Sequence, residues 1–131
     1  GQKTVWQHVD QADDEVIVVG MIEDPKAVTN IEEILCVDGL DAVFIGRGDM
    51  AVALNDRQSG APAVQEATSK VISAAKKAGK TVFLLAATPQ EAAEFYAQGV
   101  GAFVISSDQG FLRTAAANAL SAFTDSDSAR T

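Results

Sequence analysis

Two acidic residues follow predicted strands at positions where a carboxylate could bind a metal ion. Glu23 comes directly after the apolar run 16–22, and Asp49 follows the run 41–46. The carboxyl ends of neighbouring parallel strands lie at the same edge of a sheet, so the two side chains are expected to converge. Hard divalent cations bind one or two carboxylates and leave other positions to water and substrate oxygens. The pair therefore predicts a site for Lewis-acid chemistry.

Two glycines flank Arg47 directly before Asp49. Gly46 and Gly48 allow the backbone to approach a ligand closely, so their N–H groups are candidate donors to the carboxylate of an oxo acid. The alternative is structural: Glu23 can be an acid at a helix entry, and Asp49 a turn residue or helix cap. From spacing alone the structural role is the more common one, because acids are frequent at strand ends.

Strands and helices that would position these residues alternate along the chain. Continuous apolar runs rich in β-branched residues predict strands buried on both faces, and stretches with helical periodicity follow them. Thr88 is expected to cap one of these helices, with Glu91 completing a capping box. The predicted strands are 16–22, 41–46, 81–86 and 101–105, and the predicted helices begin at Asp24-Pro25 and cover about 63–78, 89–98 and 111–123.

About four βα units predict a single α/β domain over residues 1–131, with a short frayed tail at 124–131. Parallel strands need helical crossovers, and these are right-handed. Two architectures satisfy this pattern, an open doubly wound sheet and half of an eightfold barrel. No G-x-G-x-x-G follows the first strand, which favours the barrel.

Composition and charge narrow the classes of function. Ten Lys and Arg against eighteen Asp and Glu give a net charge of -8, which disfavours nucleic acid and anionic membranes as partners. An acidic chain that binds an anionic substrate needs a local positive centre, and a divalent metal supplies one. Neither a membrane-spanning run nor a signal-peptide pattern is present, so the cytoplasm is the expected compartment. The single cysteine, Cys36, lies in an apolar stretch and is expected to be a buried, inert thiol.

The segments around the two acids resemble the HpcH/HpaI (4-hydroxy-2-oxoheptanedioate) aldolase/citrate lyase family. That resemblance implies the C-terminal half of a TIM (β/α)8 barrel of the phosphoenolpyruvate/pyruvate-binding type, strands five to eight. It also implies that Glu23 and Asp49 are ligands of Mg²⁺ or Mn²⁺, or of Co²⁺, and their separation of 26 positions (49 − 23) agrees with the family spacing. The segments that carry it are Val19-Gly20-Met21-Ile22-Glu23, Ile31-Glu32-Glu33-Ile34-Leu35, Gly39-Leu40-Asp41-Ala42-Val43-Phe44-Ile45-Gly46, Asp49-Met50-Ala51, Thr88-Pro89-Gln90-Glu91-Ala92 and Ser106-Ser107-Asp108-Gln109-Gly110-Phe111-Leu112.

The activity implied by the resemblance is that of a class II pyruvate aldolase, which cleaves a 4-hydroxy-2-oxo acid to pyruvate and an aldehyde. Gly46, Gly48 and Asp49 would bind the substrate. Two alternatives stay open: a CoA-thioester lyase of the citrate or malate type, and a non-catalytic half-barrel subunit. The family's general base, a His with a supporting Asp, lies in its earlier half, as does its substrate-binding Arg. We therefore expect no catalytic residue in this chain, and His8 is expected at the surface.

Two features depart from the family pattern. Arg47 stands where the family usually has Pro, and the resulting Gly-Arg-Gly-Asp also resembles a segment of pyruvate kinase. We expect the Arg47 side chain to face a neighbouring chain rather than the substrate. The family barrel is about twice this length. The chain is therefore expected to be a fragment, a split subunit or a truncated form. It would need the missing N-terminal half or a partner chain for activity, and would belong to a homo-oligomer that exchanges its last helix.

Overall fold

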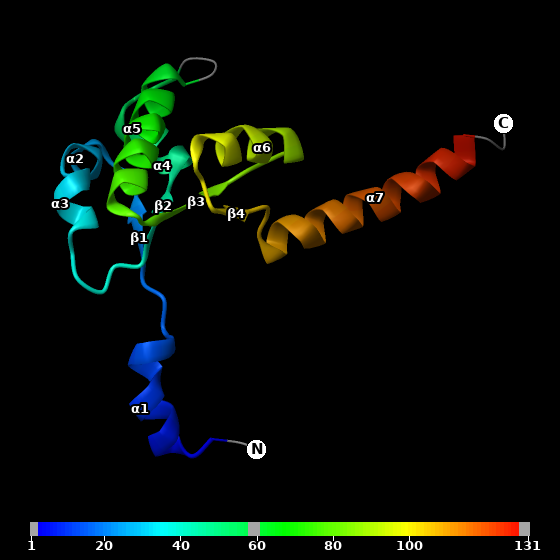
Figure 1. Cartoon of the computed structure of the whole chain (residues 1–131). Coiled ribbons are helices and arrows are strands. Elements are labelled where there is room, and N and C mark those ends of the chain that lie inside the picture. Colours follow the sequence, from blue (N-terminus) through cyan, green and yellow to red (C-terminus); the bar gives the residue numbers. More distant parts are fainter. Residues whose placement is uncertain (1–2, 58–60, 129–131) are drawn as a thin grey trace.

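A four-stranded parallel sheet forms the centre of the molecule (Figure 1). The computed structural model describes residues 3–57 and 61–128. Every neighbouring pair of strands is parallel, which confirms the predicted α/β alternation. The strands lie side by side in chain order: β1 (Val19–Ile22), β2 (Ala42–Ile45), β3 (Thr81–Leu85) and β4 (Ala102–Val104).

Helices connect the strands and flank the sheet along the chain. Those between strands are α2 (Pro25–Thr29), α3 (Ile31–Leu35), α4 (Arg47–Ala53), α5 (Pro62–Ala78) and α6 (Pro89–Gln98). Two more stand outside the alternation, α1 (Val5–Glu15) before β1 and α7 (Asp108–Ser128) after β4. Helix α7 thus continues past the expected end at residue 123, and residues 129–131 of the predicted tail lie outside the described part of the chain. Among the described residues, no helix is long and apolar enough to cross a membrane.

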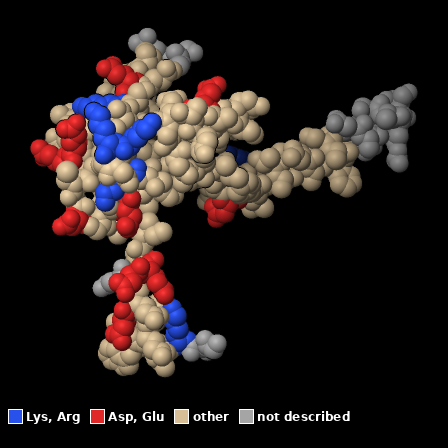
Figure 2. All heavy atoms as spheres, viewed as in Figure 1, with Lys and Arg blue, Asp and Glu red and all other residues tan. Residues whose placement is uncertain are grey.

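One face of the sheet is covered by helices and holds the core. Val43 and Leu84 point to this side and are fully buried, against Val71 and Ala75 of α5. Charges lie outside this layer: Figure 2 shows basic side chains over α5 beside acidic side chains over α3. The helical stripe predicted for residues 63–78 is therefore confirmed as a core-facing surface.

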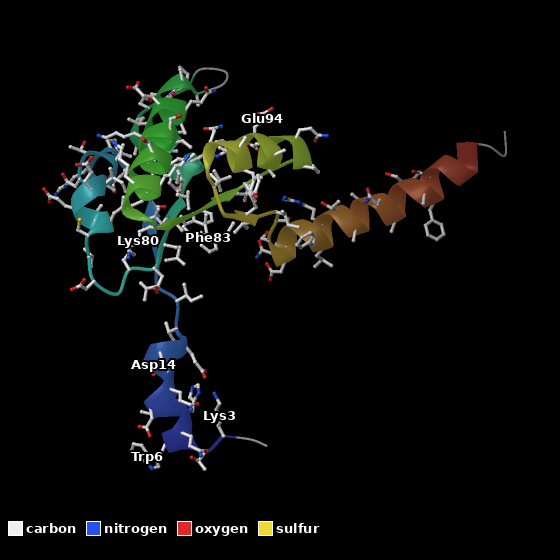
Figure 3. All side chains as sticks on the ribbon, viewed as in Figure 1. Lys3, Trp6, Asp14, Lys80, Phe83 and Glu94 are labelled. Atoms are coloured by element: carbon white, nitrogen blue, oxygen red, sulfur yellow. The ribbon has the colours of Figure 1, made fainter. Side chains whose placement is uncertain are left out.

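The other face of the sheet is open in this chain, which corrects the prediction that the strands are buried on both faces. Met21, Phe44 and Phe83 form one row across it, in register, and Met21 is 56% exposed. Leu85 and Val104 form a second row and are 45% and 37% exposed. In Figure 3 the labelled Phe83 points away from α5 and α6. A continuous apolar run predicts that both faces are buried, but no element among the described residues covers this second face.

The first strand begins later than predicted. Residues 16–18 have no regular secondary structure and are exposed, and ladder pairing starts only at Val19, opposite Ala42. Val18 is still tied to the start of β2, because its carbonyl accepts the N–H groups of Asp41 and Ala42 and its N–H donates to Oδ2 of Asp41. Cys36 is also exposed, contrary to the prediction. It is the C-cap of α3, one position beyond the buried Leu35, so the helical turn directs it outward.

Helices α1 and α7 project away from the sheet in Figure 1. Both carry large apolar side chains in solvent, and His8 on α1 is exposed as predicted. Trp6 is 75% exposed on α1, and Phe123 is 77% exposed on α7. Apolar side chains at this exposure normally mark surfaces that pack against another element or chain.

Candidate metal centre

The Glu23 side chain lies over Gly46, on the open face of the sheet beyond the tips of β1 and β2. A Cβ placed on Gly46 would lie 2.9 Å from the Cβ of Glu23, 3.1 Å from its Oε2 and 3.6 Å from Sδ of Met21. These neighbours follow from strand geometry, because alternate residues share a face and Met21 pairs with Phe44. Glycine is therefore required at position 46, because any side chain there would collide with Glu23.

Asp24, rather than Glu23, caps the helix after β1. Its Oδ1 accepts the N–H groups of Lys26 and Ala27 at 2.8 and 2.9 Å, and Pro25 occupies the first helical position as predicted. Glu23 is half-buried and has no hydrogen bond or ion pair with any residue that the structure describes. The helix-entry role that competes with metal binding is thus already filled by its neighbour.

Asp49 lies in the first turn of α4, three residues after Gly46. Its side chain is exposed and forms no hydrogen bond or ion pair within the described ranges. The N-cap of α4 is Gly46, and no side chain caps this helix. Asp49 is therefore not a helix cap, although a negative charge in a first turn is favoured by the helix dipole.

The donor set fits a hard divalent cation that keeps open positions. Glu23 and Asp49 offer two carboxylates without partners, and no group of three or more His, Cys, Asp or Glu able to hold a metal occurs among the described residues. Mg²⁺ typically binds one or two carboxylates and takes its other ligands from water and substrate. A Cβ at position 46 would fill the space that the Glu23 carboxylate occupies, so glycine at this position is consistent with a metal-binding role of Glu23.

The two glycines differ in what they contribute. The N–H of Gly46 donates to the carbonyl of Ile22 at 3.0 Å. It is therefore not free to bind a substrate carboxylate, contrary to the prediction. Gly48 lies in the uncapped first turn of α4, and a Cβ placed on it would meet nothing within 4 Å. Gly48 thus borders open space, and it is among the residues that line the cavity on the helix side of the sheet.

Arg47 is held within its own chain. Its Nη2 donates to the carbonyl of Leu85 at 2.8 Å and to Oε1 of Glu91 at 2.7 Å. The guanidinium carbon also lies 4.9 Å from the centre of the Phe95 ring, within the range of a cation–π contact. These contacts lie within one chain, contrary to the expectation that the side chain faces a neighbouring chain. They join α4 to the tip of β3 and to α6.

Glu91 uses both of its oxygens. Oε2 accepts the N–H of Ala87 at 2.7 Å, and Thr88 Oγ1 accepts the N–H of Glu91 at 3.2 Å, so the cap at Thr88 is confirmed. The return bond goes to Ala87 instead of Thr88, one residue earlier than in a capping box. The hydrogen bond from the Ala87 N–H, then the one from Arg47, lowers the pKa of the Glu91 carboxyl below its ordinary value of 4.5.

A cavity of about 900 Å³ lies on the helix side of the sheet, between α5 and α6. Arg47, Thr68, Glu91 and Phe95 are among the residues that line it, whereas Glu23 and Asp49 are not. The Thr68 hydroxyl is buried there with no hydrogen-bond partner among the described residues. Glu23 lies on the open face of the sheet instead, and Asp49 is exposed in the first turn of α4.

Comparison with known proteins identifies the family of the chain. Residues 3–115 match the HpcH/HpaI aldolase/citrate lyase family, and the chain belongs to that family. The 5-keto-4-deoxy-D-glucarate aldolase of Klebsiella pneumoniae subsp. pneumoniae is 31% identical over 121 residues, covering 92% of this chain and 47% of the aldolase.

Solved structures agree with this assignment. An HpcH/HpaI aldolase/citrate lyase family protein from Burkholderia cenocepacia J2315 aligns with a TM-score of 0.79 at 27% identity, covering 89% of this chain and 46% of that one. The citrate lyase β subunit of M. tuberculosis, solved with oxaloacetate and magnesium, aligns with a TM-score of 0.60 at 17% identity, covering 80% and 53%. The four βα units thus match about half of a TIM-barrel aldolase, and the chain spans about half the length of the relatives it matches.

Proposed function

We propose that this chain is the metal-binding half of a class II pyruvate aldolase, a carbon–carbon lyase that cleaves 4-hydroxy-2-oxo acids to pyruvate and an aldehyde. Membership in the family supports the class of activity. The observation that carries the site is the Glu23 carboxylate, which lies without a partner over Gly46 on the open face. Asp49 lies in the first turn of α4 and is also without a partner among the described residues.

In this proposal Glu23 and Asp49 hold a divalent cation, Mg²⁺ or Mn²⁺. The cation, when bound, supplies Lewis-acid stabilisation of the enolate that forms as the C3–C4 bond breaks. Gly48, in the uncapped first turn of α4, lets the carboxylate of the oxo acid approach the backbone N–H groups. The base that takes the 4-hydroxyl proton comes from outside this chain.

The open face of the sheet indicates where the rest of the barrel would pack. We propose that an N-terminal half, in the same protein or in a partner chain, closes the barrel over the rows formed by Met21, Phe44 and Phe83 and by Leu85 and Val104. An enclosed barrel interior is filled by such layers of apolar side chains. Closure would also remove water from the mouth beside Glu23, which strengthens its interaction with a bound cation. We further propose that the exposed α7 packs onto a second subunit.

The test uses the complete protein with purified 4-hydroxy-2-oxo acids, and pyruvate release is followed with a coupled dehydrogenase. We expect release that EDTA abolishes and Mg²⁺ or Mn²⁺ restores, and that is lost in Glu23→Gln and Asp49→Asn. These variants remove one negative charge with little change in shape, so their folding should be unaffected. Metal-dependent release at the wild-type rate in both variants would remove the site assignment. Cleavage of acyl-CoA substrates instead of free oxo acids would replace the aldolase with a thioester lyase.

A further inference from the structure

The first turn of α4, which carries Asp49, has few restraints of its own. Gly46 and Gly48 lie on either side of Arg47, and glycine restricts the backbone least of all residues. No side chain caps the helix, and a Cβ at Gly48 would meet nothing. Met50 is the one buried side chain of this helix, and Gly46 is held through backbone hydrogen bonds with Ile22 and Met50, so residues 47–49 have no buried side chain of their own to anchor them.

Arg47 supplies the missing restraint from the other side of the turn. One nitrogen, Nη2, donates both to the carbonyl of Leu85 and to Glu91, and the guanidinium lies over Phe95. The partner carboxylate is itself held, because its second oxygen accepts the N–H of Ala87. The side chains of Arg47 and Glu91 are 29% and 27% exposed, so water competes for this bridge only in part.

We infer that Arg47 and Glu91 are positioning residues for the proposed metal site: their bridge from α4 to the tip of β3 and to α6 fixes the turn that carries Asp49. This inference rests on the proposed function. Neither residue touches the cation or the substrate. Residues that orient metal ligands typically change metal affinity by about 10–100-fold when they are replaced. The effect is expected on affinity for the metal, beyond any effect on folding.

The experiment measures Mn²⁺ dissociation constants of the complete protein by electron paramagnetic resonance, at a temperature where every variant is folded. Arg47→Ala and Glu91→Gln should each bind Mn²⁺ about tenfold more weakly than wild type. The double variant should lose little more than Arg47→Ala alone, because both changes break the same bridge. Arg47→Pro should recover part of the affinity, since Arg47 is the first residue of α4, where proline fixes the backbone at a helical angle.

Lys80→Met is the matched control. Lys80 Nζ donates to the carbonyl of Leu40 at 2.6 Å, so it is also a cation bound to a backbone carbonyl, but it lies at the opposite end of the strands. Figure 3 labels it at the start of β3, at the end away from α4. The control should lose thermal stability while its Mn²⁺ dissociation constant stays within about twofold of wild type, since no link in the bridge is touched.

The possible failures are distinct. Wild-type Mn²⁺ affinity in both Arg47→Ala and Glu91→Gln, with lowered melting temperatures, would overturn the positioning role and leave the proposed function standing. A wild-type protein that binds no Mn²⁺ would overturn the proposed function, and the inference with it. Weaker binding in Lys80→Met to the same degree would show that any loss of stability lowers affinity, and this too would overturn the inference.

Discussion

Replacement of Gly46 by alanine is the sharpest structural perturbation of the site. The added methyl would lie 2.9 Å from Cβ of Glu23 and 3.1 Å from its Oε2. Non-bonded carbon atoms are most stable about 3.5–4.0 Å apart, so the Glu23 backbone or side chain has to move by roughly half an ångström or more. Because the nearest atom is a Cβ, a change of side-chain rotamer alone cannot relieve the contact.

The expected cost of Gly46→Ala is about 1–3 kcal/mol of unfolding free energy, which is typical for an extra methyl in a packed position. Displacement of Glu23, a metal ligand in the proposed function, adds a second effect, since a shift of about 1 Å at a reacting centre can cost roughly a hundredfold in rate. We therefore expect weaker Mn²⁺ binding and slower cleavage in the complete protein, together with lowered stability.

The assay pairs urea unfolding with Mn²⁺ titration, and Gly48→Ala is the control. Alanine at Gly48 meets nothing within 4 Å and suits a helix better than glycine, so stability should stay equal or rise by up to about 1 kcal/mol. Its Mn²⁺ affinity should be unchanged. The KM for the oxo acid should rise, because the methyl enters the space where the ligand approaches.

A double variant tests whether Glu23 is the residue displaced. Glu23→Gly removes the Cβ that Gly46→Ala would meet, so the two changes together should be less destabilising than their sum by about 1 kcal/mol or more. Metal binding should remain lost, because the carboxylate is gone. Wild-type stability and Mn²⁺ affinity in Gly46→Ala alone would refute the close approach of these two residues.

Three further predictions concern stability. The pKa of Glu91 is lowered in the folded state, so its contribution to the free energy of unfolding is complete above about pH 4.5 and is lost as the pH falls through the folded pKa. The difference in urea midpoint between wild type and Glu91→Gln should therefore shrink between pH 6 and pH 3.5. A constant difference would contradict this prediction. Asp24→Ala removes two hydrogen bonds at the start of α2 and should cost about 1 kcal/mol in urea unfolding, whereas an unchanged midpoint would show that this cap is dispensable. Met50→Ala leaves a void beneath α4 and should cost about 2–5 kcal/mol, and a loss below 1 kcal/mol would mean that the helix collapses into the space.

The sequence was sufficient for the order of the strands and of the longer helices between them, because these elements carry their own signals. Asp24-Pro25 and Thr88-Pro89 start α2 and α6 as predicted, and Gly79 and Gly99 end α5 and α6 in the left-handed conformation. Two helices were not predicted. Thr4 and Gln7 form a capping box that marks the start of α1, a signal that could have been used. The short α4 begins between two glycines, which normally disfavour a helix.

The sequence could not predict contacts that depend on distant segments. Arg47 and Glu91 are 44 positions apart, and no local periodicity relates them. The open face of the sheet was not predicted for the same reason. Met21 and Leu85 have apolar side chains suited to burial, but their burial depends on whether another segment packs against them. For Glu23 the sequence predicted the position at the end of a strand, whereas its packing over Gly46 depends on the register of β1 and β2.

The central claim is that Glu23 and Asp49 share one divalent cation. The most direct measurement is anomalous diffraction from a crystal of the complete protein grown with Mn²⁺ and oxalate, a stable analogue of the pyruvate enolate. We predict one strong peak with a carboxylate oxygen of each residue in its coordination shell and oxalate in the open positions. A Mn²⁺ ion bound elsewhere, or contacted by only one of the two carboxylates, would contradict the account.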